Sequence, residues 1–522
     1  MSHHKLQELR GRREFMANIG RGMLTASVGS TMALDLGLTK TFAAEAESRL
    51  TFAGMEPLVA MLQETPPGKL IAVLVDQVNS GTKLQTLVTA GGLANARAFG
   101  GEDYIGHHTF NALIPSLQMA QRLPQQQQAL PVFKVLYRNS SQLHARDLHH
   151  TDTLHSIEPV ADPGVSQEGL LRDSVRACDW SAAEADMSAL VAHSPDEAYQ
   201  QLLYEIQDET DVHRVVLAWR AWAMHGLAGE QYADALLRQS VRYCLQVEQS
   251  QKDRNRQSSP IRELLPKLID QYGLLSKPLG DRPAEDSWVE QLAETIYGSD
   301  RVQATEAVAA ALAEGISPQA IAEAISHASN LMVIRDPGRR KEWSNGQKPE
   351  GSTHGDSVGV HASDAANAWR NIVSVSNHRN AVASLIVGTF HTAGQSQRLI
   401  PNQFTYDTQL ETVKSTNAKE LLGLSEEAIT GNDQALACAV SHRYAEQGHD
   451  TQPFFDLMLK YAISEDGALH GEKYFHTVIE EYASTRPSLR WKQLVALARV
   501  TSSEHGYPAP GVAEAREMLK LT

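Results

Sequence analysis

Apolar residues recur every three or four positions along most of this chain, which is the spacing of amphipathic helices. One such segment opens with Ser317-Pro318, a capping residue followed by proline in the first turn. Its apolar stripe consists of Ile321, Ile325, Ala328 and Met332. Similar patterns predict helices near residues 82–97, 107–122, 178–193, 211–226, 229–248, 299–315, 361–391, 432–446, 468–485 and 488–502. No stretch alternates apolar and polar residues between hairpin turns, so we predict an all-α fold of packed helical hairpins or an irregular helical array.

Three segments interrupt the helical pattern. Residues 138–168 are polar and rich in histidine, residues 250–260 are polar and charged, and residues 335–360 are rich in glycine and proline. The last segment is long for a loop in a compact domain and leads directly into the predicted helix of His361, so we expect a lid or a site wall there. We therefore divide the chain after residue 46 into an N-terminal helical region, 47–250, and a C-terminal helical region, 251–522.

Residues 1–46 resemble a twin-arginine (Tat) export signal. Arg12-Arg13 is followed after one residue by Phe15-Met16, then by a weakly apolar stretch, and small residues offer a cleavage site near Ala46. The alternative is an ordinary amphipathic N-terminal helix. The signal predicts that the Tat translocase exports the folded chain and that the mature protein is periplasmic or secreted.

Composition narrows the possible partners. The formal net charge of −15 argues against binding nucleic acid, which needs clustered Lys and Arg. No segment after the signal has the length and apolarity of a membrane span. Cys178, Cys244 and Cys438 are far apart and odd in number, which argues against a disulfide framework. These features favour a soluble protein with a small-molecule substrate.

Histidine is the residue type that points to chemistry, with 21 in the chain. Four of them begin predicted helices that then become apolar, and these are His108, His213, His361 and His470. Imidazole is the commonest protein ligand for Zn, Fe and Cu, and histidines at separate helix starts can converge on one ion. We therefore predict that all four are metal ligands. The alternative for any one of them is a capping or core imidazole that is hydrogen-bonded to the backbone.

Two cations accompany these histidines. Lys473 follows His470 and Arg370 follows His361, and we predict that both neutralise an anionic substrate or intermediate. With His361 and His470 they form the predicted catalytic set. His378 and His391 are expected on the same long helix as His361, and rotation by about 100° per residue places them on other faces of it.

Four short segments carry a resemblance to known families. They are the helix Leu87–Arg97 leading to His108, the helix from His213, Val360-His361-Ala362, and His470 with Lys473-Tyr474-Phe475. Together they resemble an uncharacterised family of Tat-exported, mostly helical bacterial proteins. Val212-His213-Arg214 is also similar to the questin oxidase-like proteins, which are helical oxygenases with little need of a cofactor. These resemblances imply a site at His108, His213, His361 and His470.

Three kinds of function follow from these features. The first is a periplasmic oxidoreductase with a histidine-centred site for iron, copper or haem. The second is a non-redox lyase or hydrolase that depends on histidine and zinc. The third is a helical binding or scaffold protein without catalysis, which predicts that the four histidines are scattered through the fold.

Overall fold

The computed structural model describes residues 49–102, 104–150, 152–157, 168–355, 357–396 and 403–521. The predicted export signal, 1–46, lies outside the described residues. Phe52–Leu154 and Pro159–Thr522 form one compact unit, which contains all the helices considered below. The division at residue 250 stays a prediction. Among the described residues, no helix is both long and apolar enough to cross a membrane.

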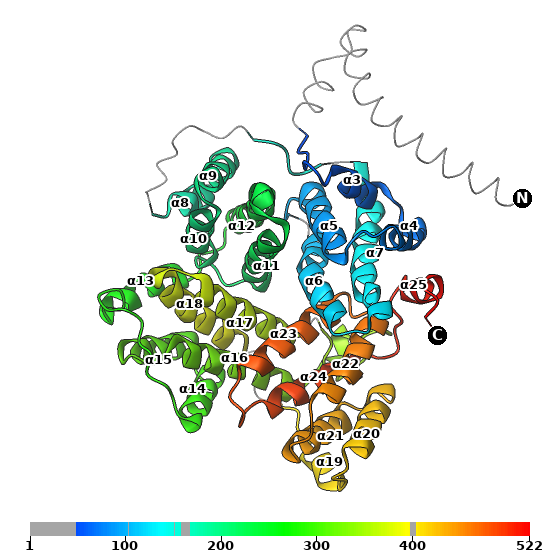
Figure 1. The fold of residues 1–522 in the computed structure, drawn as a ribbon. Helices are drawn as coiled ribbons and strands as arrows, with labels where there is room; N and C mark the ends of the chain where they lie inside the picture. The colour runs from blue at the N-terminus through cyan, green and yellow to red at the C-terminus, as the bar shows by residue number, and fades with distance from the viewer. Residues whose placement is uncertain are drawn as a thin grey trace, which may run out of the picture. The chain divides into compact units, whose positions relative to one another are not determined.

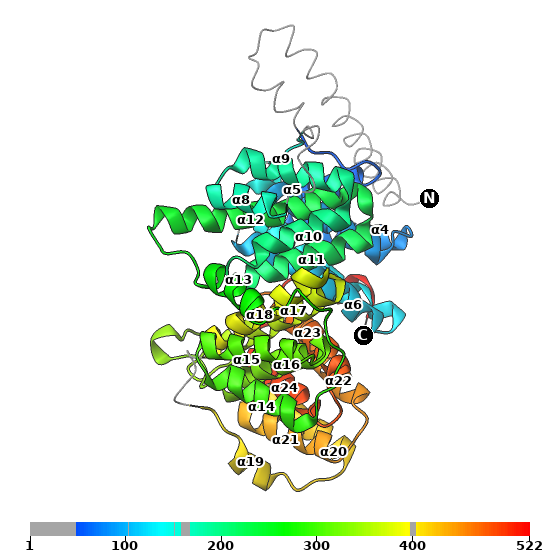
Figure 2. The same cartoon turned by 90° about the vertical axis from the view of Figure 1, so that its left-hand side faces the viewer.

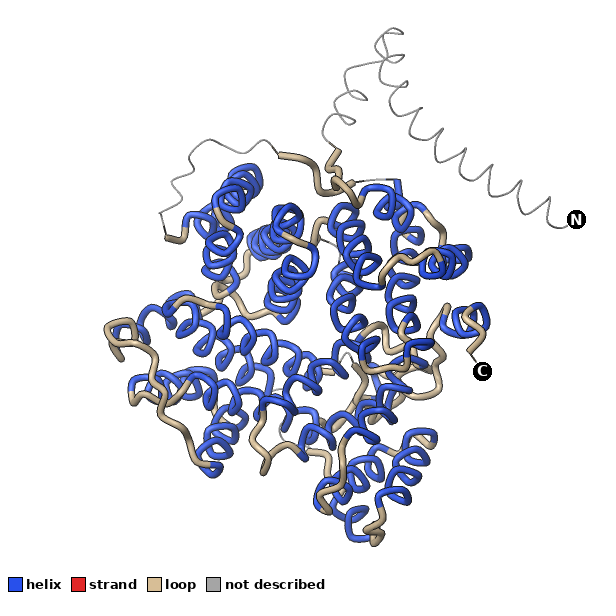
Figure 3. Tube along the Cα trace, in the orientation of Figure 1, coloured by secondary structure: helices blue, strands red, loops and turns tan. Residues whose placement is uncertain are grey.

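The all-α prediction is confirmed. The described residues form 23 α-helices and no strand (Figures 1 and 3). The helices of the first half are α3 (Glu56–Glu64), α4 (Pro67–Asn79), α5 (Leu84–Phe99), α6 (Tyr104–Gln121), α7 (Ala129–Ala145), α8 (Leu170–Ala177), α9 (Trp180–His193), α10 (Pro195–Ile206), α11 (Val212–Ala228), α12 (Ala233–Asp253) and α13 (Ile261–Gln271). Those of the second half are α14 (Asp286–Gly298), α15 (Arg301–Ala313), α16 (Pro318–Arg335), α17 (Val358–Val375), α18 (His378–Ser396), α19 (Asp407–Thr412), α20 (Ala418–Thr430), α21 (Gln434–Glu446), α22 (Gln452–Ser464), α23 (His470–Ser484), α24 (Trp491–Glu504) and α25 (Val512–Met518).

Helix α16 shows how local sequence and packing combine. Ser317 caps it, because its Oγ accepts a hydrogen bond from the backbone N–H of Ala320 at 3.3 Å, and Pro318 occupies the first turn as predicted. The predicted apolar stripe is buried. The opposite side is largely buried as well, because α14, α17, α18 and α24 all pack against this helix (Figure 2). Helix α16 is therefore a central element of the core and not a surface helix.

The single helix predicted for residues 361–391 is wrong. The chain forms two helices there, α17 and α18, which pack against each other. Ser376 leaves the helical conformation with ψ of 150°, and the side chain of Asn377 then accepts a hydrogen bond from the N–H of Asn380 at 2.9 Å. The helix breaks here because Ser376 ends α17 and Asn377 caps α18. The rotation that separates His378 and His391 from His361 therefore does not apply.

Four helices close a ring around one point. The contacts run from α6 to α11, from α11 to α17, from α17 to α23 and from α23 back to α6. A predicted site histidine lies within the first five residues of each of these helices. The N-terminal ends of the four helices therefore meet in the interior, between segments that are far apart in the sequence.

Candidate metal centre

The four histidines predicted to share a site lie together. The ring of His108 has its centroid 4.8 Å from that of His213 and 5.2 Å from that of His470. The His361 ring lies 5.6 Å from His213 and 5.2 Å from His470. The helix ring thus brings four imidazoles around one point, and this arrangement counts against scattered histidines with separate capping roles.

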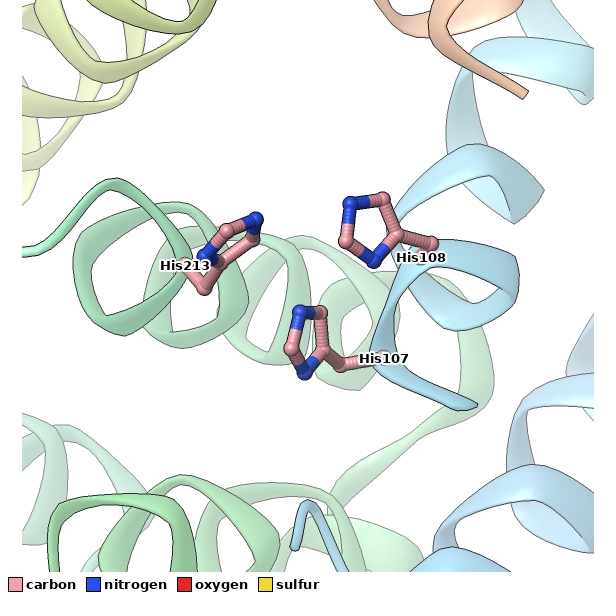
Figure 4. Close-up of side chains that lie close together, drawn as sticks. All are labelled: His107, His108 and His213. Atoms are coloured by element: carbon pink, nitrogen blue, oxygen red, sulfur yellow. The ribbon is translucent and has the colours of Figure 1, made fainter. Parts of the chain in front are cut away.

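A fifth imidazole, His107, also belongs to this group. Its ring centroid lies 4.7 Å from that of His108 and 4.6 Å from that of His213, and Figure 4 shows these three rings facing one another from α6 and α11. No role is predicted for His107 from the sequence. We call the five residues His107, His108, His213, His361 and His470 the histidine cluster.

The histidine cluster contains two groups that could hold a metal ion. In the first, one ligand atom each from His107, His108 and His213 lies within 4.8 Å of the others. In the second, the same holds for His108, His361 and His470. Both groups consist of imidazole alone, a ligand type that suits Zn, Cu, Fe and Ni and not Mg or Ca.

Backbone carbonyls fix the orientation of two of these rings. His361 Nδ1 lies 3.0 Å from the carbonyl oxygen of Ser357, and His470 Nδ1 lies 3.1 Å from that of Gly467. A carbonyl oxygen can only accept, so each Nδ1 carries the proton and each Nε2 presents a lone pair. His470 Nε2 is buried and has no hydrogen-bond partner among the described residues. This orientation fits a metal ligand.

Burial keeps three of the five cluster histidines neutral. Desolvation, reinforced by repulsion from His361 and Lys473, lowers the pKa of His213 to about 2. Desolvation also lowers the pKa of His107 and of His470 well below the ordinary value. Because the neutral imidazole is the form that binds a metal, protons compete little for these nitrogens near neutral pH.

Lys473 follows His470 by one turn of α23 and lies beside the cluster, and its role toward an anion stays a prediction. It is buried, and desolvation, opposed by attraction to Asp364, lowers its pKa to about 8. Its charge contributes to the lowered pKa of three cluster histidines, which are His107, His213 and His470. The Lys473 amine can therefore exchange a proton near neutral pH at this site.

Arg370 lies on a different side of α17 from His361 and pairs with Glu481. Its Nε and Nη2 donate to Glu481 at 3.1 and 2.6 Å, and the two residues line a pocket beside α16. Nine residues separate Arg370 from His361, a rotation of about 900°, which leaves it half a turn away on α17. Its role toward an anion stays a prediction.

Arg220 is the buried arginine on the cluster side of its helix. It follows His213 by seven residues, a rotation of about 700°, so the two side chains share one face of α11. Arg220 is 4% exposed, its Nε has no hydrogen-bond partner among the described residues, and its charge contributes to lowering the pKa of Lys473.

The glycine-rich loop forms one wall of the cluster. It runs between the end of α16 at Arg335 and the start of α17 at Val358, in agreement with the predicted 335–360. Gly355 donates its N–H to Glu504 Oε1 at 2.8 Å, and a Cβ at this glycine would lie 2.2 Å from the Cβ of His470. Only glycine allows the loop to come this close.

We expect Gly355→Ala to displace His470 or the loop and to weaken metal binding at least tenfold. Overpacking of this kind costs about 1–3 kcal/mol, which also lowers the melting temperature. Gly346→Ala is the matched control, because a methyl group added at this glycine of the same loop would meet no atom within 4 Å. Competition titration with a metal chelator checks the difference. Equal affinities of the two variants would show that the loop does not hold His470 in place.

Comparison with family models, with curated proteins and with solved structures finds no match to this chain. The family resemblances of the four short segments therefore stay predictions, and the function proposed below depends on the geometry of the histidine cluster.

Proposed function

We propose that this protein is a periplasmic oxidoreductase that works with a transition-metal ion held by the histidine cluster. The observation that carries the proposal is the convergence of five imidazoles from four helices. The orientation of His361 and His470 supports it, because both rings donate Nδ1–H to the backbone and direct Nε2 inward. The predicted Tat signal supports the location, since that route carries folded chains with their cofactors already inserted.

An iron or copper ion in this site would supply one-electron chemistry. The chain itself would hold the ion with neutral ligands and shield it on most sides, since His107, His108 and His470 are buried. His213 and His361 are only partly buried, so we place substrate access at the edge between them. Lys473 would provide or accept the proton that accompanies electron transfer.

The packing of the cluster favours a bare ion over haem. A porphyrin needs a wide, flat slot in front of the coordinating nitrogen of its axial ligand. Around His108, however, the rings of His107, His213 and His470 have their centroids within 5.2 Å. The same ligands would also fit zinc, which keeps the predicted lyase or hydrolase as the second outcome of the test below.

The test is the metal content and absorption spectrum of the full chain, expressed with its N-terminal segment. We expect iron or copper bound to the purified protein, with visible or near-ultraviolet absorption. Replacing His108, His213, His361 and His470 together by alanine should remove it. His327→Ala is the matched control, since His327 is a buried histidine that interacts with Lys492 outside the cluster.

Other outcomes separate the alternatives. Bound zinc without visible absorption would replace the oxidoreductase by the hydrolase or lyase. If the purified protein binds none of these metals, and the fourfold replacement changes neither its metal content nor its absorption, the proposal is wrong.

A further inference from the structure

The two three-histidine groups share one residue, His108, and differ in all the others. His107 contacts His108 and His213 on one side, and His470 contacts His108 and His361 on the other. His108 is therefore common to both groups, and His213 of the first group also lies beside His361 of the second, with ring centroids 5.6 Å apart. A tetrahedral ion such as zinc takes four ligands, so the five rings offer more imidazole than one such ion uses.

We propose that the cluster holds two transition-metal ions, one on each group, with His108 at their junction; this inference rests on the proposed metal site. An imidazole has two ring nitrogens, and Figure 4 shows one nitrogen of His108 on the side of His107 and the other on the far side. Binding through both nitrogens releases the ring proton of His108 to solvent. The imidazolate that remains carries a negative charge between the two cations.

Each group also has a carboxylate nearby to offset the charge of its ion. Asp211 Oδ1 lies 3.7 Å from His213 Nδ1 beside the first group and accepts a hydrogen bond from the Tyr243 hydroxyl at 2.7 Å. Beside the second group, a Cβ added to Gly467 or Gly471 would meet the carboxylate oxygens of Glu504 within 3.5 Å. Glu504 is 5% exposed, and it faces the start of α23, where His470 lies. Each proposed ion therefore has one carboxylate near its group, the half-buried Asp211 for the first and the buried Glu504 for the second.

The backbone before His470 supports a built site on the second group. Ala468 and Leu469 both have positive φ, at 51° and 66°, a conformation that side-chain-bearing residues rarely adopt. Such outliers persist where surrounding structure holds them and gather at functional sites. Here they direct the chain into α23 so that His470 is its first residue.

The experiment is a copper(II) titration of the metal-free full chain, with excess glycine present to remove copper bound at the surface. We expect two copper ions per chain, and an electron paramagnetic resonance intensity well below that of two isolated ions because the spins couple through His108. His107→Ala and His470→Ala should each retain one ion with the full intensity of isolated copper. His108→Ala should abolish the coupling.

Two controls keep the count specific. His327→Ala removes a buried histidine outside the cluster and should still bind two ions. His149→Ala disrupts the surface group in which His149 stacks on His144 at 4.2 Å, and it should leave the count at two.

One ion per wild-type chain with uncoupled intensity would overturn the two-ion inference and leave the proposed metal site standing. If the wild-type chain retains neither copper nor another transition metal, both the two-ion inference and the proposed metal site are wrong. The stoichiometry and spectrum of the wild-type protein decide between these results even if a variant fails to fold.

Discussion

Replacing Arg499 by methionine should lower the free energy of unfolding by roughly 3–6 kcal/mol, because three buried carbonyl groups would each lose a charged donor. Arg499 is fully buried on α24 and donates to the carbonyl oxygens of Val333 at 2.7 Å, Ile334 at 3.0 Å and Asp336 at 2.7 Å. These are carbonyls at the end of α16, where a helix has no partners of its own. Urea unfolding monitored by circular dichroism measures the loss.

The control is Arg340→Met in the glycine-rich loop, where the side chain is 65% exposed. Exposed ion pairs contribute little, so this variant should unfold like the wild type. If Arg499→Met also unfolds like the wild type, water must reach the end of α16 and replace the arginine. Because the loop that contacts His470 starts at this point, we also expect Arg499→Met to weaken metal binding.

The stability of the metal-free protein should rise with pH between about 8 and 10.5, by roughly 3 kcal/mol, and Lys473→Met should lack this rise. Burial lowers the pKa of Lys473 from 10.5 to about 8 in the folded protein. Between these values the folded chain has released the proton and the unfolded chain still holds it. Unfolding therefore takes up a proton, and raising the pH disfavours the unfolded state.

The measurement is urea unfolding of metal-free wild type, Lys473→Met and Lys69→Met at a series of pH values from 7 to 11. Lys69 is exposed, so its variant should follow the wild-type profile. The informative quantity is the difference between the wild type and Lys473→Met, because tyrosines titrate in the same range and cancel. A difference that stays constant with pH would mean that the Lys473 ammonium reaches solvent.

Helix propensity and apolar spacing were sufficient for the fold class. Capping signals such as Ser317-Pro318 act through neighbouring atoms and were correctly interpreted. The break between α17 and α18 was missed although its signal, Ser376-Asn377, is equally local. The continuous apolar character of both helices concealed it, since α17 and α18 are each buried over most of their surface.

The cations of the site show what helix geometry adds to sequence. His213 and Arg220 share a face of α11, whereas Arg370 lies half a turn from His361, and rotation by about 100° per residue distinguishes the two cases. The sequence analysis missed His107 because adjacent residues on a helix point about 100° apart, so His107 and His108 were not expected in one site. Helix α6 has partners on several sides, and both side chains therefore reach the same cluster.

The sequence by itself determined the all-α class, individual helices such as α16, the loop at 335–360 and the four helix-start histidines, because these depend on interactions between residues close along the chain. Only the tertiary structure decided that α6, α11, α17 and α23 meet at their N-terminal ends, and that His107 joins the cluster while Arg370 pairs with Glu481. The contacts responsible join residues more than a hundred positions apart, so no local pattern records them. The packing of apolar helix faces against one another brings the histidines together, so their spacing in the sequence does not predict the site.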